Sequence, residues 1–139
     1  MSTLKVTGAP RVHATGAQRD ANGTKGRFDL IPPRAMREVA IHYQHGAEVR
    51  GERNWERGMP LSWFLDSALR HVYAILEGRT DERHDRAAAW NLMSFIETRA
   101  RIEAGLLPAS LNDLPTLEPP AKDAAVLVGD VLGVPANVP

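Results

Sequence analysis

Apolar residues recur at spacings of three and four positions through the middle of the chain, which is the period of a helix that buries one side. The pattern predicts helices over residues 33–46, 62–78 and about 81–104. The expected apolar stripe of the second helix consists of Phe64, Leu65, Ala68, Leu69, Val72, Ile75 and Leu76. That of the third consists of Ala87, Ala88, Trp90, Leu92, Met93, Phe95, Ile96 and Ile102. No segment alternates as a half-buried strand does, so we expect an all-α helical bundle.

Residues typical of helix ends bound these three segments. The first helix opens on two prolines, which the first turn tolerates, and is expected to stop at Gly46. Ser62 is expected to cap the start of the second helix, and Gly78 follows its last turn. Thr80 or Asp81 can cap the third.

The chain divides into three parts. Residues 1–26 carry scattered glycines without periodicity and predict an extended arm, and residues 27–105 form the helical domain. Residues 106–139 are rich in proline and leucine, so we expect this tail to pack on its own domain or on a neighbouring subunit. Three helices bury a modest core, and we therefore expect a homo-oligomer, a dimer or tetramer, to complete it.

Composition excludes several classes of function. The 17 lysines and arginines balance the 17 aspartates and glutamates, so the chain lacks the basic footprint of a protein that binds polymeric nucleic acid. With no cysteine, disulfides, zinc–thiolate sites and thiol nucleophiles are excluded. No apolar run has the length of a membrane span and no signal-peptide pattern opens the chain, so we expect a cytoplasmic protein without membrane contact.

The second predicted helix carries four polar residues at steps of four, three and four. These are Asp66, Arg70, Tyr73 and Glu77. The steps place all four on one face, beside the apolar stripe. That face is either a solvated surface with an Asp66–Arg70 ion pair or one wall of a site.

Acidic residues also gather at the start of the third helix, at Asp81, Glu82 and Asp85. Helix capping explains them as well as chemistry does, because the amino end of a helix favours negative charge. Across the short turn, however, Asp66 and Glu77 can converge with Asp81 and Asp85. Converging carboxylates repel one another unless a cation lies between them, and hard oxygen ligands favour Mg²⁺ or Mn²⁺.

Other polar residues each have two interpretations. Asn91, among apolar neighbours, either belongs to a core network or faces a ligand, because a buried amide needs partners. Trp55 is a hydrophobic anchor or a platform on which a base stacks. His84 is an ordinary hydrogen-bonding residue or a catalyst. Lys25 and Arg27 form a short basic cluster able to grip phosphates.

A set of short motifs follows in consistent order from about Gly16 to Thr98. They are Gly26 to Ala35, Gly46-Ala47, Arg53-Asn54-Trp55, Asp66 to His71, Glu77-Gly78, His84 and Ala88 to Asn91. The chain thereby resembles the phage dATP/dGTP diphosphohydrolases, the MazZ-like branch of the MazG-like all-α pyrophosphohydrolases. The resemblance implies an oligomeric, metal-dependent enzyme that cuts a purine deoxynucleoside triphosphate between the α and β phosphates. Such an enzyme reshapes the nucleotide pool of a phage, in the host cytoplasm.

The resemblance also implies which residues hold metal and act in catalysis. Candidate ligands for Mg²⁺ or Mn²⁺ are Asp66, Glu77, Asp81, Glu82, Asp85 and Glu38. Candidate catalytic residues are Asp66, Arg70, His71 and His84. Either histidine would orient the attacking water or a phosphate oxygen, and the arginine would stabilise charge on the leaving pyrophosphate.

Candidate substrate-binding residues complete the expected site. They are Lys25, Arg27, Asn54, Trp55 and Asn91. The basic residues would neutralise phosphate, with Arg50 as a further candidate, while either asparagine would read the base or the sugar. Trp55 would stack on the purine.

A rival interpretation is a non-catalytic helical oligomer that binds nucleotide or serves as a structural phage component. The family typically holds metal with a Glu-x-x-Glu pair on one helix and Glu-x-x-Asp on the next. The chain contains no Glu-x-x-Glu, whereas Glu82-x-x-Asp85 fits the second pattern. The missing pair favours the rival.

Overall fold

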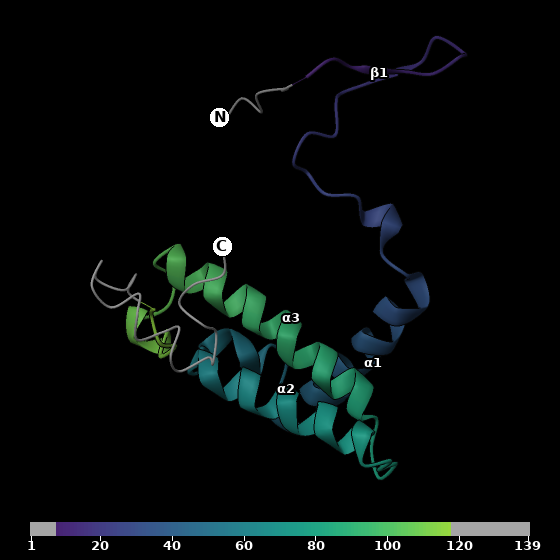
Figure 1. Cartoon of the computed structure of the whole chain (residues 1–139). Helices are drawn as coiled ribbons and strands as arrows, with labels where there is room; N and C mark the ends of the chain where they lie inside the picture. Colours follow the sequence, from purple (N-terminus) through teal and green to yellow (C-terminus); the bar gives the residue numbers. More distant parts are fainter. Residues whose placement is uncertain (1–7, 118–139) are drawn as a thin grey trace, which may run out of the picture.

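The computed structural model describes residues 8–117 and confirms the all-α fold (Figure 1). Its three main helices are α1 (Pro33–Arg50), α2 (Leu61–Leu76) and α3 (His84–Glu103). Helices α2 and α3 form an antiparallel hairpin with the most extensive contact in the described chain, and α1 packs on α3. No helix in residues 8–117 is long and apolar enough to cross a membrane.

Two of the expected helix starts and one expected stop are wrong. Gly46 lies inside α1, which continues to Arg50 and ends at Gly51, whose φ of 90° leaves the helical region. Helix α2 begins at Leu61, one residue before the predicted cap Ser62, so Ser62 lies inside the helix. Instead the Ser62 N–H donates to Asp113 Oδ1 at 2.9 Å, so the orphan donor is satisfied by a side chain 51 residues away.

Gly78 follows the last turn of α2, as predicted, and this helix end determines how the chain returns along α3. After Glu77, Gly78 adopts a φ of 74°, and the Arg79 and Gly78 N–H groups donate to the carbonyls of Ala74 and Ile75. This pair of bonds is a Schellman motif, which needs glycine at the left-handed position. The next helix then starts at His84, so the predicted caps Thr80 and Asp81 lie in the connecting turn.

The buried faces differ from the predicted apolar stripes. The buried residues of α3 are small or polar: His84, Ala87, Ala88, Asn91, Ser94 and Thr98. Alanine and serine let α3 approach its neighbours closely, and Phe64 and Leu61 of α2 are the largest fully buried side chains of the described residues. Several large apolar residues expected in the core are exposed: Leu69, Val72, Ile75, Leu76, Leu92, Met93 and Ile96.

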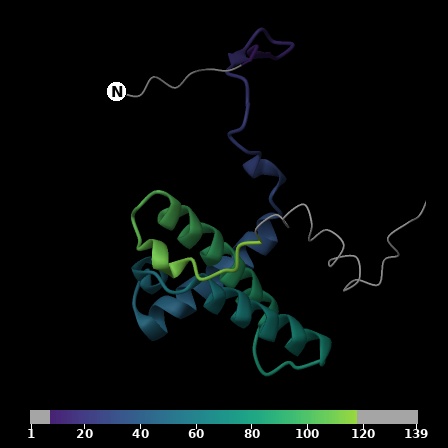
Figure 2. The ribbon, with the colours of Figure 1, turned by 60° about the vertical axis from the view of Figure 1, so that its left-hand side comes forward.

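The segments that flank the helices differ in how they meet the bundle. Strands β1 (Arg11–Val12) and β2 (Gln18–Arg19) pair as a small antiparallel hairpin that extends away from the helices, followed by the 3₁₀ turn η1 (Phe28–Leu30) (Figures 1 and 2). On the other side, η3 (Ala109–Leu111) packs on α3. Residues 118–139 of the predicted tail lie outside the described residues.

Candidate active site

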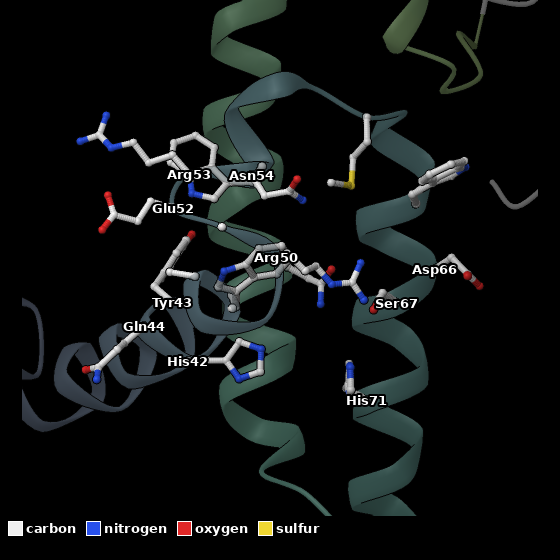
Figure 3. Close-up of a pocket in the computed structure, with 18 of the residues that line it drawn as sticks. His42, Tyr43, Gln44, Arg50, Glu52, Arg53, Asn54, Asp66, Ser67 and His71 are labelled. Atoms are coloured by element: carbon white, nitrogen blue, oxygen red, sulfur yellow. The ribbon is translucent and has the colours of Figure 1, made fainter.

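A cavity of about 800 Å³ opens between the carboxyl half of α1, the loop that follows it, and the facing sides of α2 and α3 (Figure 3). The loop contains the 3₁₀ turn η2 (Asn54–Arg57). All three tryptophans of the chain line the cavity, together with three arginines, two histidines and two asparagines. The lining residues used below are His42, Tyr43, Arg50, Arg53, Asn54, Trp55, Trp63, Asp66, Ser67, Arg70, His71, Trp90 and Asn91.

Aromatic rings form one wall of this cavity. The Trp90 ring lies 5.7 Å from the Tyr43 ring and 6.2 Å from that of Phe64, centroid to centroid. The Tyr43 hydroxyl and Ser94 Oγ are 2.9 Å apart, which joins α1 to α3 behind the wall. Burial raises the pKa of Tyr43, so its hydroxyl stays protonated at neutral pH. The wall is therefore a rigid, largely apolar surface.

The Arg53-Asn54-Trp55 segment holds a second aromatic face at the rim. Arg53 has a φ of 55°, the one positive φ at a non-glycine residue in the described chain. Such strain is retained where the surroundings fix the backbone, and here it starts the turn that carries Trp55. The indole is held edge-on to Tyr43, with Arg101 stacked over it at 5.7 Å. Trp55 is thus anchored and also lines the cavity, and stacking of a base on its ring stays a prediction.

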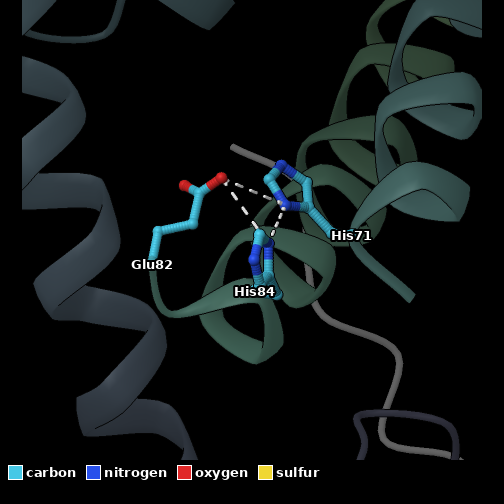
Figure 4. A group of neighbouring side chains, drawn as sticks. All are labelled: His71, Glu82 and His84. Carbon is cyan, nitrogen blue, oxygen red and sulfur yellow. Dashed lines mark hydrogen bonds and ion pairs between the residues drawn. The ribbon is translucent and has the colours of Figure 1, made fainter. Parts of the chain in front are cut away.

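His71, which lies at one end of the cavity in Figure 3, meets a second histidine (Figure 4). His71, from α2, and His84, from the first turn of α3, place their Nδ1 atoms 3.0 Å apart. Glu82 Oε1, on the turn between them, lies 3.5 Å from His84 Nδ1 and 3.8 Å from His71 Nδ1. Within residues 8–117 these three side chains form the one group of potential metal ligands whose donor atoms lie within 4.8 Å of one another.

A carboxylate orients the buried member of this group. His84 is 4% exposed, and its Nε2 donates to Asp81 Oδ1 at 2.9 Å. The hydrogen bonds from His84 and then Arg79 lower the pKa of Asp81 to about 2, so the carboxylate is ionised and can only accept. In the tautomer that carries its proton on Nε2, Nδ1 has the lone pair, which faces His71 and Glu82.

The predicted convergence of carboxylates across the Gly78 turn is not found in the described chain. Glu38 is bound by Arg86, at 2.6 Å, and by Arg83. Asp85 is held by Arg83, and that hydrogen bond lowers the pKa of Asp85 to about 2. The arginines contribute to this separation, because each pairs with one carboxylate and offsets its charge.

The remaining acidic candidates are also placed apart from one another. Asp66 lines the cavity and accepts from Arg70, one turn further along α2. Glu77 lies exposed after the last residue of α2, and Asp81 accepts a hydrogen bond from His84. Of the six predicted metal ligands, Glu82 alone joins the group described above.

The predicted substrate-binding residues separate into two groups. Asn54, Trp55 and Asn91 all line the cavity. Asn91 is 5% exposed and donates from Nδ2 to the Ala87 carbonyl, and the structure gives its amide oxygen no partner in residues 8–117. Lys25, on the arm, and Arg27, directly after it, lie outside the cavity, and the Arg27 guanidinium is bound to Asp29.

Several cavity residues were not predicted from the sequence. His42, from α1, faces His71 across the end of the cavity, and burial lowers the pKa of His42, which keeps its ring neutral. Trp63 and Ser67 line the α2 side. The helical register could have revealed both, since Ser67 stands four residues before His71 and Trp63 four before Ser67.

Comparison with known families agrees with this arrangement. A family described as dATP/dGTP diphosphohydrolase, N-terminal, matches residues 15–105, which contain all three main helices and the cavity. The chain belongs to this family. It is thereby placed among the nucleotide diphosphohydrolases, as the resemblance of the motifs implied. Comparisons with curated proteins and with solved structures gave no match.

Proposed function

We propose that the protein hydrolyses purine deoxynucleoside triphosphates, dGTP or dATP, to the monophosphate and pyrophosphate. One observation carries the proposal: the cavity joins aromatic rings, arginines and His71, which contacts His84, in a single space of nucleotide size. Family membership supports the reaction class. In a phage-infected cell the reaction would reshape the purine nucleotide pool of the host cytoplasm.

The lining residues divide by chemistry in the way that a nucleotide requires. Trp55 offers a face for stacking of the purine, held rigid by Tyr43 and Arg101. Asn54 and Asn91 supply amide groups that can pair with the base edge or the sugar. These contacts would orient the nucleoside against the aromatic wall.

The triphosphate would lie at the basic side of the cavity. Arg50, Arg53 and Arg70 line it, and arginine binds phosphate oxygens through paired N–H groups. Asp66 accepts a hydrogen bond from Arg70 and thereby fixes the direction of its guanidinium. Charge on the leaving pyrophosphate would be stabilised by these cations as it develops.

The reaction is proposed to require a divalent cation, Mg²⁺ or Mn²⁺. His71, Glu82 and His84 could hold a divalent metal ion, because their donor atoms lie within 4.8 Å of one another and His84 is oriented by Asp81. A bound cation supplies charge neutralisation on the phosphates and acidifies water. His42 and His71 face the same end of the cavity, where a neutral imidazole can accept the proton of the attacking water.

We further propose that the working form is a homo-oligomer, a dimer or tetramer. Leu69 and Leu76 of α2 are 58% and 75% exposed, and Leu92 and Ile96 of α3 are also open to solvent. Apolar residues at helical spacing on two adjacent helices leave a face that a second copy would cover.

The test of the proposed reaction is pyrophosphate release from a panel of deoxynucleoside and ribonucleoside triphosphates, with Mg²⁺, with Mn²⁺ and with EDTA. We expect metal-dependent release that favours dGTP or dATP. Release from no member of the panel, by folded protein, would contradict the proposal and favour a non-catalytic oligomer that binds nucleotide.

A further inference from the structure

The donor set at the end of the cavity differs from the one that a magnesium enzyme needs. Two imidazole nitrogens and one carboxylate oxygen meet there, His71 Nδ1, His84 Nδ1 and Glu82 Oε1. Mg²⁺ prefers oxygen ligands and retains its waters, whereas imidazole suits first-row transition metals. Two histidines and one glutamate also form a known protein ligand set of catalytic zinc, with a position left open.

We infer that His71, Glu82 and His84 form a resident site for a first-row transition-metal ion, which binds before and without nucleotide. A separate Mg²⁺ or Mn²⁺ ion would then arrive with the triphosphate. The site deepens the proposed function, since it supplies a cation beside His71, at one end of the cavity, and to that extent it rests on that function. Its occupancy, however, is a property of the protein alone.

The geometry of the two histidines supports this inference. Nitrogens 3.0 Å apart can both reach one ion at about 2.1 Å, the usual metal–imidazole distance. Glu82 lies farther off, at 3.5 and 3.8 Å, but its side chain is half-exposed on the turn and free to approach.

The surroundings of His84 support it independently. A ligating histidine almost always donates its other ring N–H to a carboxylate or carbonyl, which fixes the tautomer. His84 does so to Asp81, and Arg79 in turn binds that carboxylate at 3.0 Å. The His84 side chain is 4% exposed, and its Nδ1 lies 3.0 Å from His71 Nδ1 and 3.5 Å from Glu82 Oε1.

The direct test is titration of the metal-stripped full chain with Co²⁺ in the absence of nucleotide, followed by visible absorption, with Zn²⁺ binding by calorimetry. We expect one Co²⁺ per chain and ligand-field bands that Zn²⁺ abolishes and Mg²⁺ does not. His71→Ala and Glu82→Gln should each weaken Co²⁺ binding by more than about tenfold. If the His71→Ala protein fails to fold, Glu82→Gln tests the site instead, because Glu82 is not buried and its replacement should leave folding intact. His45→Ala, at an exposed histidine outside the cavity, is the matched control and should bind as the unmodified chain does.

Stoichiometric Co²⁺ binding that survives both Glu82→Gln and His71→Ala would overturn the assignment, as would the failure of Co²⁺ and Zn²⁺ to bind. These results are independent of the proposed reaction. A chain that binds Co²⁺ at this site but releases no pyrophosphate would retain the metal site and refute the hydrolysis. Pyrophosphate release without Co²⁺ or Zn²⁺ binding would support the hydrolysis and refute the metal site.

Discussion

His71 and His84 are thirteen positions apart in the chain, yet their Nδ1 atoms lie 3.0 Å from each other. The Schellman motif at Gly78 produces this meeting, because it reverses the chain directly after α2. The turn returns Glu82 and His84 beside the helix that carries His71. The end of α2 thus brings His71, Glu82 and His84 together.

Replacing Trp55 tests the stacking surface. Trp55→Ala should raise the KM for dGTP by about tenfold or more, because stacking of a base on an aromatic ring contributes about 1–3 kcal/mol. Steady-state kinetics at several dGTP concentrations would measure it. Trp55→Phe keeps a ring and should retain most of the affinity.

The effect of Trp55→Ala on folding must be separated from its effect on binding, because the ring also packs on Tyr43. Thermal melting of each variant gives that control. A Trp55→Ala protein that melts normally and has an unchanged KM would show that the base lies elsewhere.

The Asp66–Arg70 pair tests the phosphate side of the cavity. Arg70→Gln should raise the KM for dGTP by about tenfold, since a hydrogen bond to a charged group contributes about 1.5–3 kcal/mol. Both side chains of the pair are exposed, so the melting temperature should change little. Arg99→Gln, on an exposed ion pair of α3 outside the cavity, is the matched control.

Asp66→Asn separates two roles of the same carboxylate. If Asp66 directs the Arg70 guanidinium, Asp66→Asn should reproduce the effect of Arg70→Gln and leave folding intact. If Asp66 is itself essential to turnover, Asp66→Asn should remove nearly all activity while Arg70→Gln does not. Wild-type kinetics in both variants would exclude Asp66 and Arg70 from the site.

The contacts of Glu38 with Arg86 and Arg83 predict how the free energy of unfolding depends on pH. The Arg86 hydrogen bond, with Arg83 nearby, lowers the pKa of Glu38 in the folded protein below its ordinary 4.5. A lowered folded pKa contributes stability above the unfolded pKa and loses it as the pH falls through the folded value. Urea unfolding should therefore show Glu38→Gln to be less stable than the unmodified chain at about pH 7, with the difference shrinking towards about pH 3. A difference that is the same at both pH values would contradict the role of this ion pair.

The exposed apolar face of α2 predicts the oligomeric state. Light scattering should give a mass that is a multiple of 15.3 kDa, and Leu69→Lys with Leu76→Lys should reduce it to that of one chain. A charge in a buried interface is strongly unfavourable, whereas at an exposed position it is harmless. A monomeric unmodified chain, or a double variant of unchanged mass, would refute the interface.

Local sequence features predicted much of the helical scaffold. The apolar period and Gly78 placed the start of α2 within one residue and its end within two, because propensity and capping are local. Gly46 gave a wrong prediction for the end of α1, since a glycine inside a helix is tolerated when neighbouring turns are well packed. Asp113, which satisfies Ser62 from 51 positions away, has no local signature at all.

The site was less predictable than the scaffold. His71, His84 and Glu82 were each singled out from the sequence, but their meeting depends on the angle of the turn that joins α2 to α3. The carboxylates Glu38 and Asp85 were candidates of equal merit until the structure paired them with Arg86 and Arg83. Residue type and spacing do not show which carboxylates an arginine has already neutralised.

The most direct test of the central claim compares pyrophosphate release from dGTP by the unmodified chain, His71→Ala and His45→Ala, each shown to be folded. We predict metal-dependent release by the unmodified chain and His45→Ala, and a loss of about 100-fold or more in His71→Ala, the scale of a lost catalytic group. Equal release by all three proteins would contradict the account, because hydrolysis would then not depend on the histidine pair at the end of the cavity.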